Sequence, residues 1–303
     1  MCIKKGMVVK MKHKTKIALL LLIIIILIII ILCYNKTSVT LTQLSPQGSR
    51  QMMGYILKTN TGKLILIDGG TIEDTENLIK QINQNGGKVH CWFLTHAHDD
   101  HVGAFTEIVN NTDIQIEKIY VSVNELSWYE QNEPSRVEFT RKFLETLALQ
   151  KHKVIEPTLN EKIIIDNLQI EILGIKNPEI IENAGNEQSM VFTINTRRNK
   201  MLFLGDTGEI SSKKLLENQK ENLKSDIVQM AHHGQQGATK ELYEEVKPKI
   251  CLWPTPKWLW DNDAGEGFNT GNWKTLETRE WMEELKIKKH YIAKDGDITI
   301  KIK

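Results

Sequence analysis

The chain has 303 residues, of which 41% are hydrophobic and 25% are charged, and these values are ordinary for a globular enzyme. The apolar content suffices for a core that needs no disulfide or metal staples. The formal net charge is +1, but lysines are concentrated in residues 1–16, so the remainder is mildly acidic. Nothing in that remainder forms the basic stripe that would indicate nucleic-acid binding.

The N-terminus is typical of a membrane anchor. An unbroken apolar run covers residues 17–33 and follows the lysine-rich segment 1–16. Its length is at the short end of what spans a bilayer as a helix. The positive-inside rule places the N-terminus in the cytoplasm. We therefore expect a basic cytoplasmic tail at 1–16, a transmembrane signal anchor at 17–34 and an extracytoplasmic catalytic domain at 35–303, in a single-pass protein of the cell membrane.

Two other outcomes for this segment are a cleaved signal peptide and a lipoprotein modified at Cys33. Cleavage requires small residues at the exit of the apolar run, and none is present there. Leu32 directly precedes Cys33 and is large for a lipidation signal. The sequence therefore favours an uncleaved anchor over both alternatives.

After the anchor, the apolar pattern predicts alternating strands and helices. A first strand is expected at 39–44, and a hairpin at 52–58 and 63–67, whose turn is Asn60-Thr61-Gly62. Its second strand runs into Asp68. Further strands are expected at 89–94, 119–123, 162–165, 169–173, 189–194, 201–204, 227–230, 250–253, 290–293 and 298–302. Helices are expected at 73–83, 102–109, 135–150, 211–218, 240–246 and 275–285.

The most informative segment directly follows the apolar strand 89–94. Three histidines and two aspartates fall within the six residues 96–101. Imidazole and carboxylate are ligands that zinc prefers. The spacing indicates that His96 and His98 face one metal ion, and Asp100 and His101 a second. The alternative is a polar loop with incidental histidines, which such a concentration disfavours.

This segment is similar to the His-x-His-x-Asp-His motif of the metallo-β-lactamase superfamily. The resemblance implies an α/β fold, the αββα metallo-β-lactamase sandwich, preceded here by one transmembrane helix, with one or two metal ions at one edge. Further landmarks follow in the same order. The resemblance implies that Asp68 supports the site through a ligand, that Asp206 bridges the metals, and that His232-His233-Gly234 supplies the last ligand. His232 is the preferred ligand, and His233 then supports the site or faces the substrate.

The His-His-Gly sequence is similar to a ComEC-like subset that includes phosphodiester and phosphocholine esterases. The superfamily's further histidine ligand is missing from 183–189, where Asn186 and Ser189 match the Asn-x-x-Ser pattern of that subset. Asn186 would replace the histidine, contact the substrate, or only form a turn. The subset's late Asn-x-Tyr-Gly-His-Pro pattern is also missing, since residues 268–273 contain no histidine.

A long loop that is rich in tryptophan follows the strand at 250–253 and reaches Trp273. Loops of this length inside a compact domain are usually functional or disordered, and large aromatic residues disfavour disorder. Trp258 and Trp260 are therefore candidates for a substrate-facing wall that recognises choline or stacks on a base. The alternative is that they pack the loop against the core.

The resemblance implies a hydrolase in which metal-activated water attacks the substrate, with Asp100 and Asp206 as the catalytic carboxylates. The cofactor is expected to be one or two Zn²⁺ ions, with Mn²⁺ as the alternative. The expected substrate is a small or polymeric phosphodiester outside the membrane. Nucleic acid is not indicated by charge, although bound metal supplies its own positive charge. The alternatives are hydrolysis of a lactone, thioester or β-lactam carbonyl, and a non-catalytic metal-binding or regulatory module.

Overall fold

The computed structural model describes residues 15–27 and 39–302. The chain divides into two units, Met1–Ser38 and Val39–Lys303. In the first unit, residues 15–27 form a helix, and the rest of the expected anchor, 28–34, lies outside the described residues. Among the described segments, no helix has both the length and the apolar character needed to cross a bilayer.

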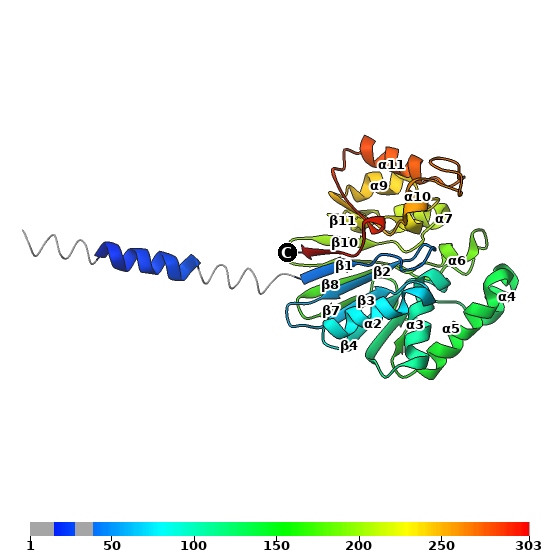
Figure 1. Ribbon diagram of the computed structural model, residues 1–303, viewed down its shortest axis with the longest axis horizontal. Coiled ribbons are helices and arrows are strands. Elements are labelled where there is room, and N and C mark those ends of the chain that lie inside the picture. The colour runs from blue at the N-terminus through cyan, green and yellow to red at the C-terminus, as the bar shows by residue number, and fades with distance from the viewer. Residues whose placement is uncertain (1–14, 28–38, 303) are drawn as a thin grey trace, which may run out of the picture. The chain divides into compact units, whose positions relative to one another are not determined.

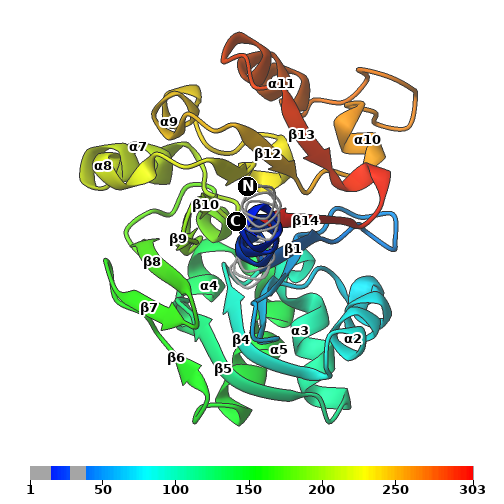
Figure 2. The ribbon, with the colours of Figure 1, turned by 90° about the vertical axis from the view of Figure 1, so that its left-hand side faces the viewer.

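The second unit is built from two seven-stranded sheets stacked between two layers of helices (Figures 1 and 2). The first sheet has the order β14 (Ile298–Ile302), β1 (Val39–Gln43), β2 (Gly54–Lys58), β3 (Leu64–Asp68), β4 (Lys88–Leu94), β5 (Gln115–Val121), β6 (Val154–Ile155). The second has the order β13 (Lys289–Ile292), β12 (Ile250–Trp253), β11 (Ile227–Gln229), β10 (Lys200–Phe203), β9 (Val191–Asn195), β8 (Leu168–Gly174), β7 (Lys162–Ile165).

Helices cover the outer face of each sheet (Figure 1). The helices beside the first sheet are η1 (Ile72–Asp74), α2 (Thr75–Gln84), α3 (Asp99–Asn111), α4 (Leu126–Asn132), η2 (Pro134–Arg136) and α5 (Val137–Leu149). Those on the side of the second are α6 (Ala184–Glu187), α7 (Glu209–Asn218), α8 (Lys220–Leu223), η3 (Ala231–Gly234), α9 (Lys240–Val246), α10 (Lys257–Trp260), α11 (Thr275–Glu284) and η4 (Ala293–Asp295).

The core has three layers because successive side chains of a strand point to opposite faces. In β3, Ile65 and Ile67 belong to the cluster between the sheets, whereas Leu64 and Leu66 pack with the helices of the first layer. In β10, Phe203 lies between the sheets. Strands buried on both faces are continuous apolar runs, which is why the sequence pattern revealed them. The αββα sandwich that was expected is confirmed.

The polar landmarks gather at one edge of this sandwich. Strand β3 pairs in parallel with β4, and β10 pairs in parallel with β11. The carboxyl ends of parallel strands share one edge, where α/β proteins bind ligands. Asp68 is the last residue of β3, and the segment from His96 follows β4. Asp206 follows β10, and the segment from His232 follows β11. The fold therefore converts four separated sequence positions into one cluster.

Two of the elements that differ from the expectation bear on the site. Helix α3 begins at Asp99 rather than at residue 102, because His98 is its extended N-terminal cap and its carbonyl accepts hydrogen bonds from His101 N and Val102 N. Asp100 and His101 are therefore held in the first helical turn. Helix α4 was not expected, because its seven residues are too few to show apolar periodicity. It ends at Asn132, and its C-terminal cap Glu133 lies beside His98.

Candidate metal centre

Asp68, at the end of β3, fixes Thr95 and His101 through hydrogen bonds. Its Oδ1 accepts a hydrogen bond from Thr95 N at 2.8 Å, and its Oδ2 from Thr95 Oγ1 at 2.7 Å. The same Oδ2 lies 2.7 Å from His101 Nδ1, and both residues are fully buried. This contact fixes the ring of His101, so that Nε2 faces the centre of the site. It is the arrangement that the resemblance implies for Asp68.

One cluster of ligand atoms comes from Asp100, His101 and His233, all buried and all within 4.8 Å of one another. His233 Nδ1 is held by the carbonyl of Pro254 at 3.0 Å. Its Nε2 therefore faces inward, 3.3 Å from His101 Nε2 and 3.4 Å from Asp100 Oδ2. Gln51 Nε2 donates to that same Oδ2 at 2.9 Å and orients the carboxylate.

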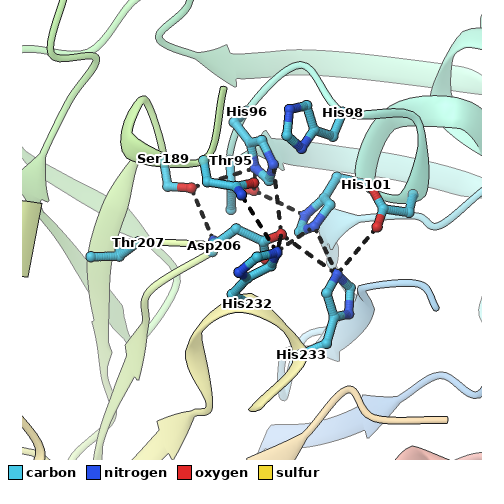
Figure 3. A network of polar contacts seen from close by, with 12 residues as sticks. Thr95, His96, His98, His101, Ser189, Asp206, Thr207, His232 and His233 are labelled. Carbon is cyan, nitrogen blue, oxygen red and sulfur yellow. Dashed lines mark hydrogen bonds and ion pairs between the residues drawn. The ribbon is translucent and has the colours of Figure 1, made fainter. Parts of the chain in front are cut away.

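A second cluster combines His96, His101 and Asp206 (Figure 3). Asp206 lies between the histidines, with Oδ1 3.1 Å from His101 Nε2 and Oδ2 3.8 Å from His96 Nε2. Ser189 Oγ accepts a hydrogen bond from Asp206 N at 2.9 Å and lies 3.5 Å from His96 Nδ1. Ser189 thus positions one carboxylate and one imidazole of the cluster.

His232 and His233 both turn toward Asp206, although they are consecutive. Both backbones are in the left-handed region, with φ of 48° and 56°, which is unusual for non-glycine residues. His232 Nδ1 is held by the Gln236 carbonyl at 2.6 Å, and its Nε2 lies 3.4 Å from Asn186 Nδ2 and 3.9 Å from Asp206 Oδ2. The sequence favours His232 as the ligand, and the cluster with Asp100 and His101 contains His233. His232 instead faces Asn186, where the superfamily's usual histidine is missing.

His98 belongs to neither cluster, although its ring lies edge-on to that of His96, with centroids 4.5 Å apart. No hydrogen bond or ion pair is drawn to His98 in Figure 3. Its Nε2 lies 2.7 Å from Oε1 of Glu133, at the end of α4. This contact leaves Nδ1 as the free ring nitrogen. The carboxylate of Glu133 was missed by sequence reasoning, because nothing in a residue 35 positions away from His98 marks it as a partner.

Three comparisons bear on this geometry. The sequence profile of the metallo-β-lactamase superfamily matches residues 53–293. The chain belongs to this superfamily. No curated protein matches the chain at a significant level.

Several solved structures resemble the chain. The fold protein YhfI from Bacillus subtilis has a TM-score of 0.54 and 12% identity, covering 88% of this chain and 100% of its own. Igni18, a metallo hydrolase from Ignicoccus hospitalis, has a TM-score of 0.52 and 16% identity, and the match covers 88% of this chain and 100% of the Igni18 chain. A variant of the β-hydroxylase CmlA reaches 0.52 with 11% identity, covering 87% of this chain and 54% of its own. At these identities the likeness is one of fold. By superfamily and site, the chain is a metallo-β-lactamase-fold hydrolase.

The electrostatics of this metallo-β-lactamase site favour metal binding. Burial, together with His101 and His98, holds the pKa of His96 well below its usual range, so that its imidazole is neutral and able to bind metal. Burial opposes ionisation of Asp206, but the facing histidines, led by His101, hold its pKa well below normal. Burial lowers the pKa of His101, yet Asp206 and Asp68 outweigh it and raise that pKa. A metal ion would displace this proton.

Unpartnered buried atoms show that the residues fit a metal. His96 Nε2, Asp100 Oδ1 and Asn186 Oδ1 are buried without a hydrogen-bond partner, and Asp206 Oδ1 has only the ion-pair contact with His101. Buried polar atoms normally have partners, and leaving them without one is costly. Their imidazole nitrogen and carboxylate oxygens are donors that suit Zn²⁺ and, less selectively, Mn²⁺. A divalent cation would satisfy several of them at once.

The two tryptophans proposed as a substrate wall lie in different environments. Trp260 packs against Trp253, with ring centroids 5.2 Å apart, and carries the guanidinium of Arg279 4.2 Å above its ring. These contacts pack the loop against the core. Trp258 contacts Trp273 at 4.9 Å and donates from Nε1 to the carbonyl of Ser49 at 2.9 Å. Trp258 therefore packs against the loop before β2, and a role of Trp258 in substrate binding stays a prediction.

Proposed function

We propose that the protein is a dinuclear metal-dependent hydrolase of phosphodiester-type substrates. The observation that supports it most is the His232-His233 pair, whose Nε2 atoms lie 3.9 and 3.6 Å from the same oxygen of Asp206. The same oxygen lies 3.8 Å from His96 Nε2, so Asp206 faces His233 of one cluster and His96 of the other, as a metal-bridging ligand would. Pairs of metal ions are a recurrent device of phosphatases and nucleases. The consecutive His-His-Gly sequence is also the feature shared with the ComEC-like esterases.

We assign the site's histidines to two ligand sets that share Asp206, and we add His98 and His232 to the cluster around His96. The first ion would be held by His96, His98, His232 and Asp206, and the second by Asp100, His101, His233 and Asp206. We propose Zn²⁺ at both positions, with Mn²⁺ as the alternative. When bound, such ions lower the pKa of water toward neutrality and stabilise negative charge on phosphoryl oxygens.

The chain's own residues hold and orient the reacting groups. Asp100 and Asp206 stay ionised, since the pKa of each is held well below its usual range by facing histidines, against the effect of burial. Each carboxylate can accept a hydrogen bond from the attacking water, and a proton from it as the reaction proceeds. Asn186 Nδ2 is engaged by Asn183 Oδ1 at 2.8 Å, which leaves its buried Oδ1 for the substrate or the first ion.

We propose that the active domain acts outside the cell membrane, anchored through residues 17–34. The apolar run and the lysines before it support this orientation. Protease treatment of intact cells tests it, because an outward-facing domain is digested without lysis. Protection of the domain until lysis would overturn the proposed orientation.

The proposed activity is tested with the full-length protein in detergent. Metal content is measured, and hydrolysis of bis-p-nitrophenyl phosphate is followed with and without chelator. About two ions per chain and chelator-sensitive hydrolysis are expected. The variant His152→Ala is the control, because this histidine is exposed and far from the site in sequence.

Two results would contradict the proposal. Two bound ions with turnover of a lactone or thioester, but none of the phosphodiester, would instead assign a carbonyl hydrolase. Fewer than one ion after metal is restored, with no turnover of any of these substrates, would favour a non-catalytic metal-binding module.

A further inference from the structure

A cationic cavity lies next to the metal centre and has no role in the reaction described above. It has a volume of about 740 Å³, and its cationic lining residues are Arg50, Arg136 and Lys142. Asp99 lies in the same lining and stands in the sequence between the metal-site residues His98 and Asp100. The cavity therefore adjoins the site through a single residue.

The two arginines converge on Asp99 from separate parts of the fold. Arg136, at the end of η2, donates from Nη1 to Asp99 Oδ1 at 2.9 Å, and Arg50, from the loop before β2, pairs with Oδ2. A guanidinium has five N–H donors in a planar fork. The carboxylate of Asp99 therefore occupies only a minority of the N–H donors of Arg50 and Arg136. The two side chains are 41% and 49% exposed. Their remaining donors are open to a ligand.

The charges in this cavity are not balanced. The lining has three cations and two carboxylates, Asp99 and Glu138, which leaves one net positive charge. Lys142 is 55% exposed, and its ion-pair partner Glu107 is 4.0 Å away, at the outer limit of such a contact. Clustered arginine with lysine is how proteins recognise phosphate groups.

A chain of charged contacts links this cavity to His98, a proposed ligand of the first ion. Arg136 Nε lies 3.7 Å from Glu133 Oε1, and the same oxygen lies 2.7 Å from His98 Nε2. A ligand group held by Arg136 is therefore two contacts away from a predicted metal ligand.

We propose that the cavity is a subsite for a second anionic group, of the phosphate class, on the substrate whose phosphodiester lies at the metal centre. This inference rests on the proposed function and narrows its substrate class. The substrate is then a polyanion, such as a repeating phosphodiester or a nucleotide with a further phosphate, rather than an isolated diester.

The test compares two substrates on the metal-loaded, full-length protein. One is the p-nitrophenyl ester of thymidine 5′-monophosphate, and the other is the same ester with an added 3′-phosphate. We expect the second to have a kcat/KM about tenfold higher, equivalent to one further charge-assisted contact. The advantage should shrink as salt is added, because exposed charges are screened.

Matched variants identify the subsite. Lys142→Gln and Arg50→Gln should each reduce the preference for the second substrate to about twofold or less. Arg141→Gln is the control, because Arg141 is the neighbouring cation on α5 but pairs with Glu130 outside the cavity. It should leave the preference unchanged. Metal content is measured for each variant, so that a damaged centre is recognised.

The outcomes separate this inference from the proposed function. No hydrolysis of either ester by the metal-loaded wild type would overturn the proposed function itself. Hydrolysis of both esters at equal kcat/KM would overturn only the subsite. Inorganic phosphate is the third probe, and it should inhibit the wild type more than Lys142→Gln. A preference retained in Lys142→Gln and Arg50→Gln would place the second anion elsewhere and contradict the assignment.

Discussion

The carboxylate of Glu133 fixes which nitrogen of His98 is free. Oε1 lies 2.7 Å from Nε2, so that only Nδ1 remains for a metal ion. His101, His232 and His233 are arranged in the opposite sense, since in each the Nδ1 atom is held by a protein acceptor and Nε2 faces the centre. The partner of each ring nitrogen sets its tautomer and its ligand atom. His98 thus enters the site by its other nitrogen.

Glu133→Gln should weaken metal binding at the first position. The amide lacks the charge that holds the ring, and loss of such an outer partner typically costs about 10- to 100-fold in metal affinity. We expect one of two ions to be lost at about 10- to 100-fold lower chelator concentration than in the wild type. Competition with a chromogenic chelator measures this. Glu130→Gln is the control, because Glu130 lies in the same helix and pairs with Arg141 at the surface. Equal affinities in both variants would show that Glu133 does not position His98.

His232→Ala and His233→Ala should each remove one metal ion. The two rings face different clusters around Asp206, so that neither can substitute for the other. We expect metal content to fall from about two ions to about one in each single variant, and hydrolysis to fall by at least about 100-fold, because both ions contribute to catalysis in two-metal sites. Elemental analysis after dialysis reports the stoichiometry. Full metal content in His232→Ala would restrict the ligand role to His233.

The sequence was sufficient to predict the sandwich and most of its strands. Strand β7 at 162–165, strand β12 at 250–253 and helix α9 at 240–246 have the bounds that the apolar pattern predicts. Their signals are local, because burial on both faces or an apolar stripe is visible in consecutive residues. The resemblance implied only that Asp68 supports the site through a ligand, and the structure places its Oδ2 2.7 Å from His101 Nδ1.

The remaining parts of the site depend on backbone shape and distant contacts. Whether His232 or His233 joins Asp100 is decided by two left-handed residues, and no local propensity predicts them for histidine. Glu133 and Gln51 reach the site across 35 and 49 positions from their partners. A single sequence shows that such residues are polar, but only the tertiary fold brings them to a ligand.

Asp166, in the turn between β7 and β8, should make the free energy of unfolding change with pH in the acid range. Asp166 accepts hydrogen bonds from Lys63, Thr61 and Thr59; burial opposes its ionisation, but these contacts win and hold its pKa at about 2. A carboxyl with a depressed folded pKa stabilises the fold above its unfolded pKa of about 4, and loses that contribution as pH falls to about 2.

Asp166→Asn should therefore lower the free energy of unfolding at neutral pH by about 1 kcal/mol, and the difference from the wild type should vanish near pH 2. Urea unfolding at a series of pH values, with metal absent throughout, measures it. Asp113→Asn is the control, because Asp113 is exposed. A difference that persists unchanged from pH 7 to pH 2 would rule out the ionised carboxylate as its cause.

Gly185→Ala should disturb the contact between His98 and Glu133 without altering a glycine-specific backbone. A Cβ at this position would lie 2.1 Å from His98 Nε2 and 2.5 Å from Glu133 Oε2, so that one of them must move. Overpacking of this kind costs about 1–3 kcal/mol. We expect a lower melting temperature and the same loss of one ion as in Glu133→Gln, because both changes act on His98.

The double variant Gly185→Ala/Glu133→Gln separates a shared cause from two independent ones. If both substitutions act by displacing the His98 ring, their effects on metal affinity overlap. The double variant then has nearly the same metal affinity as the single variant that binds metal less tightly. Residues in contact commonly show such non-additivity, whereas independent sites add within about 0.5 kcal/mol. Fully additive losses in chelator competition would mean that Gly185 affects the site by another route, such as the neighbouring Asn186.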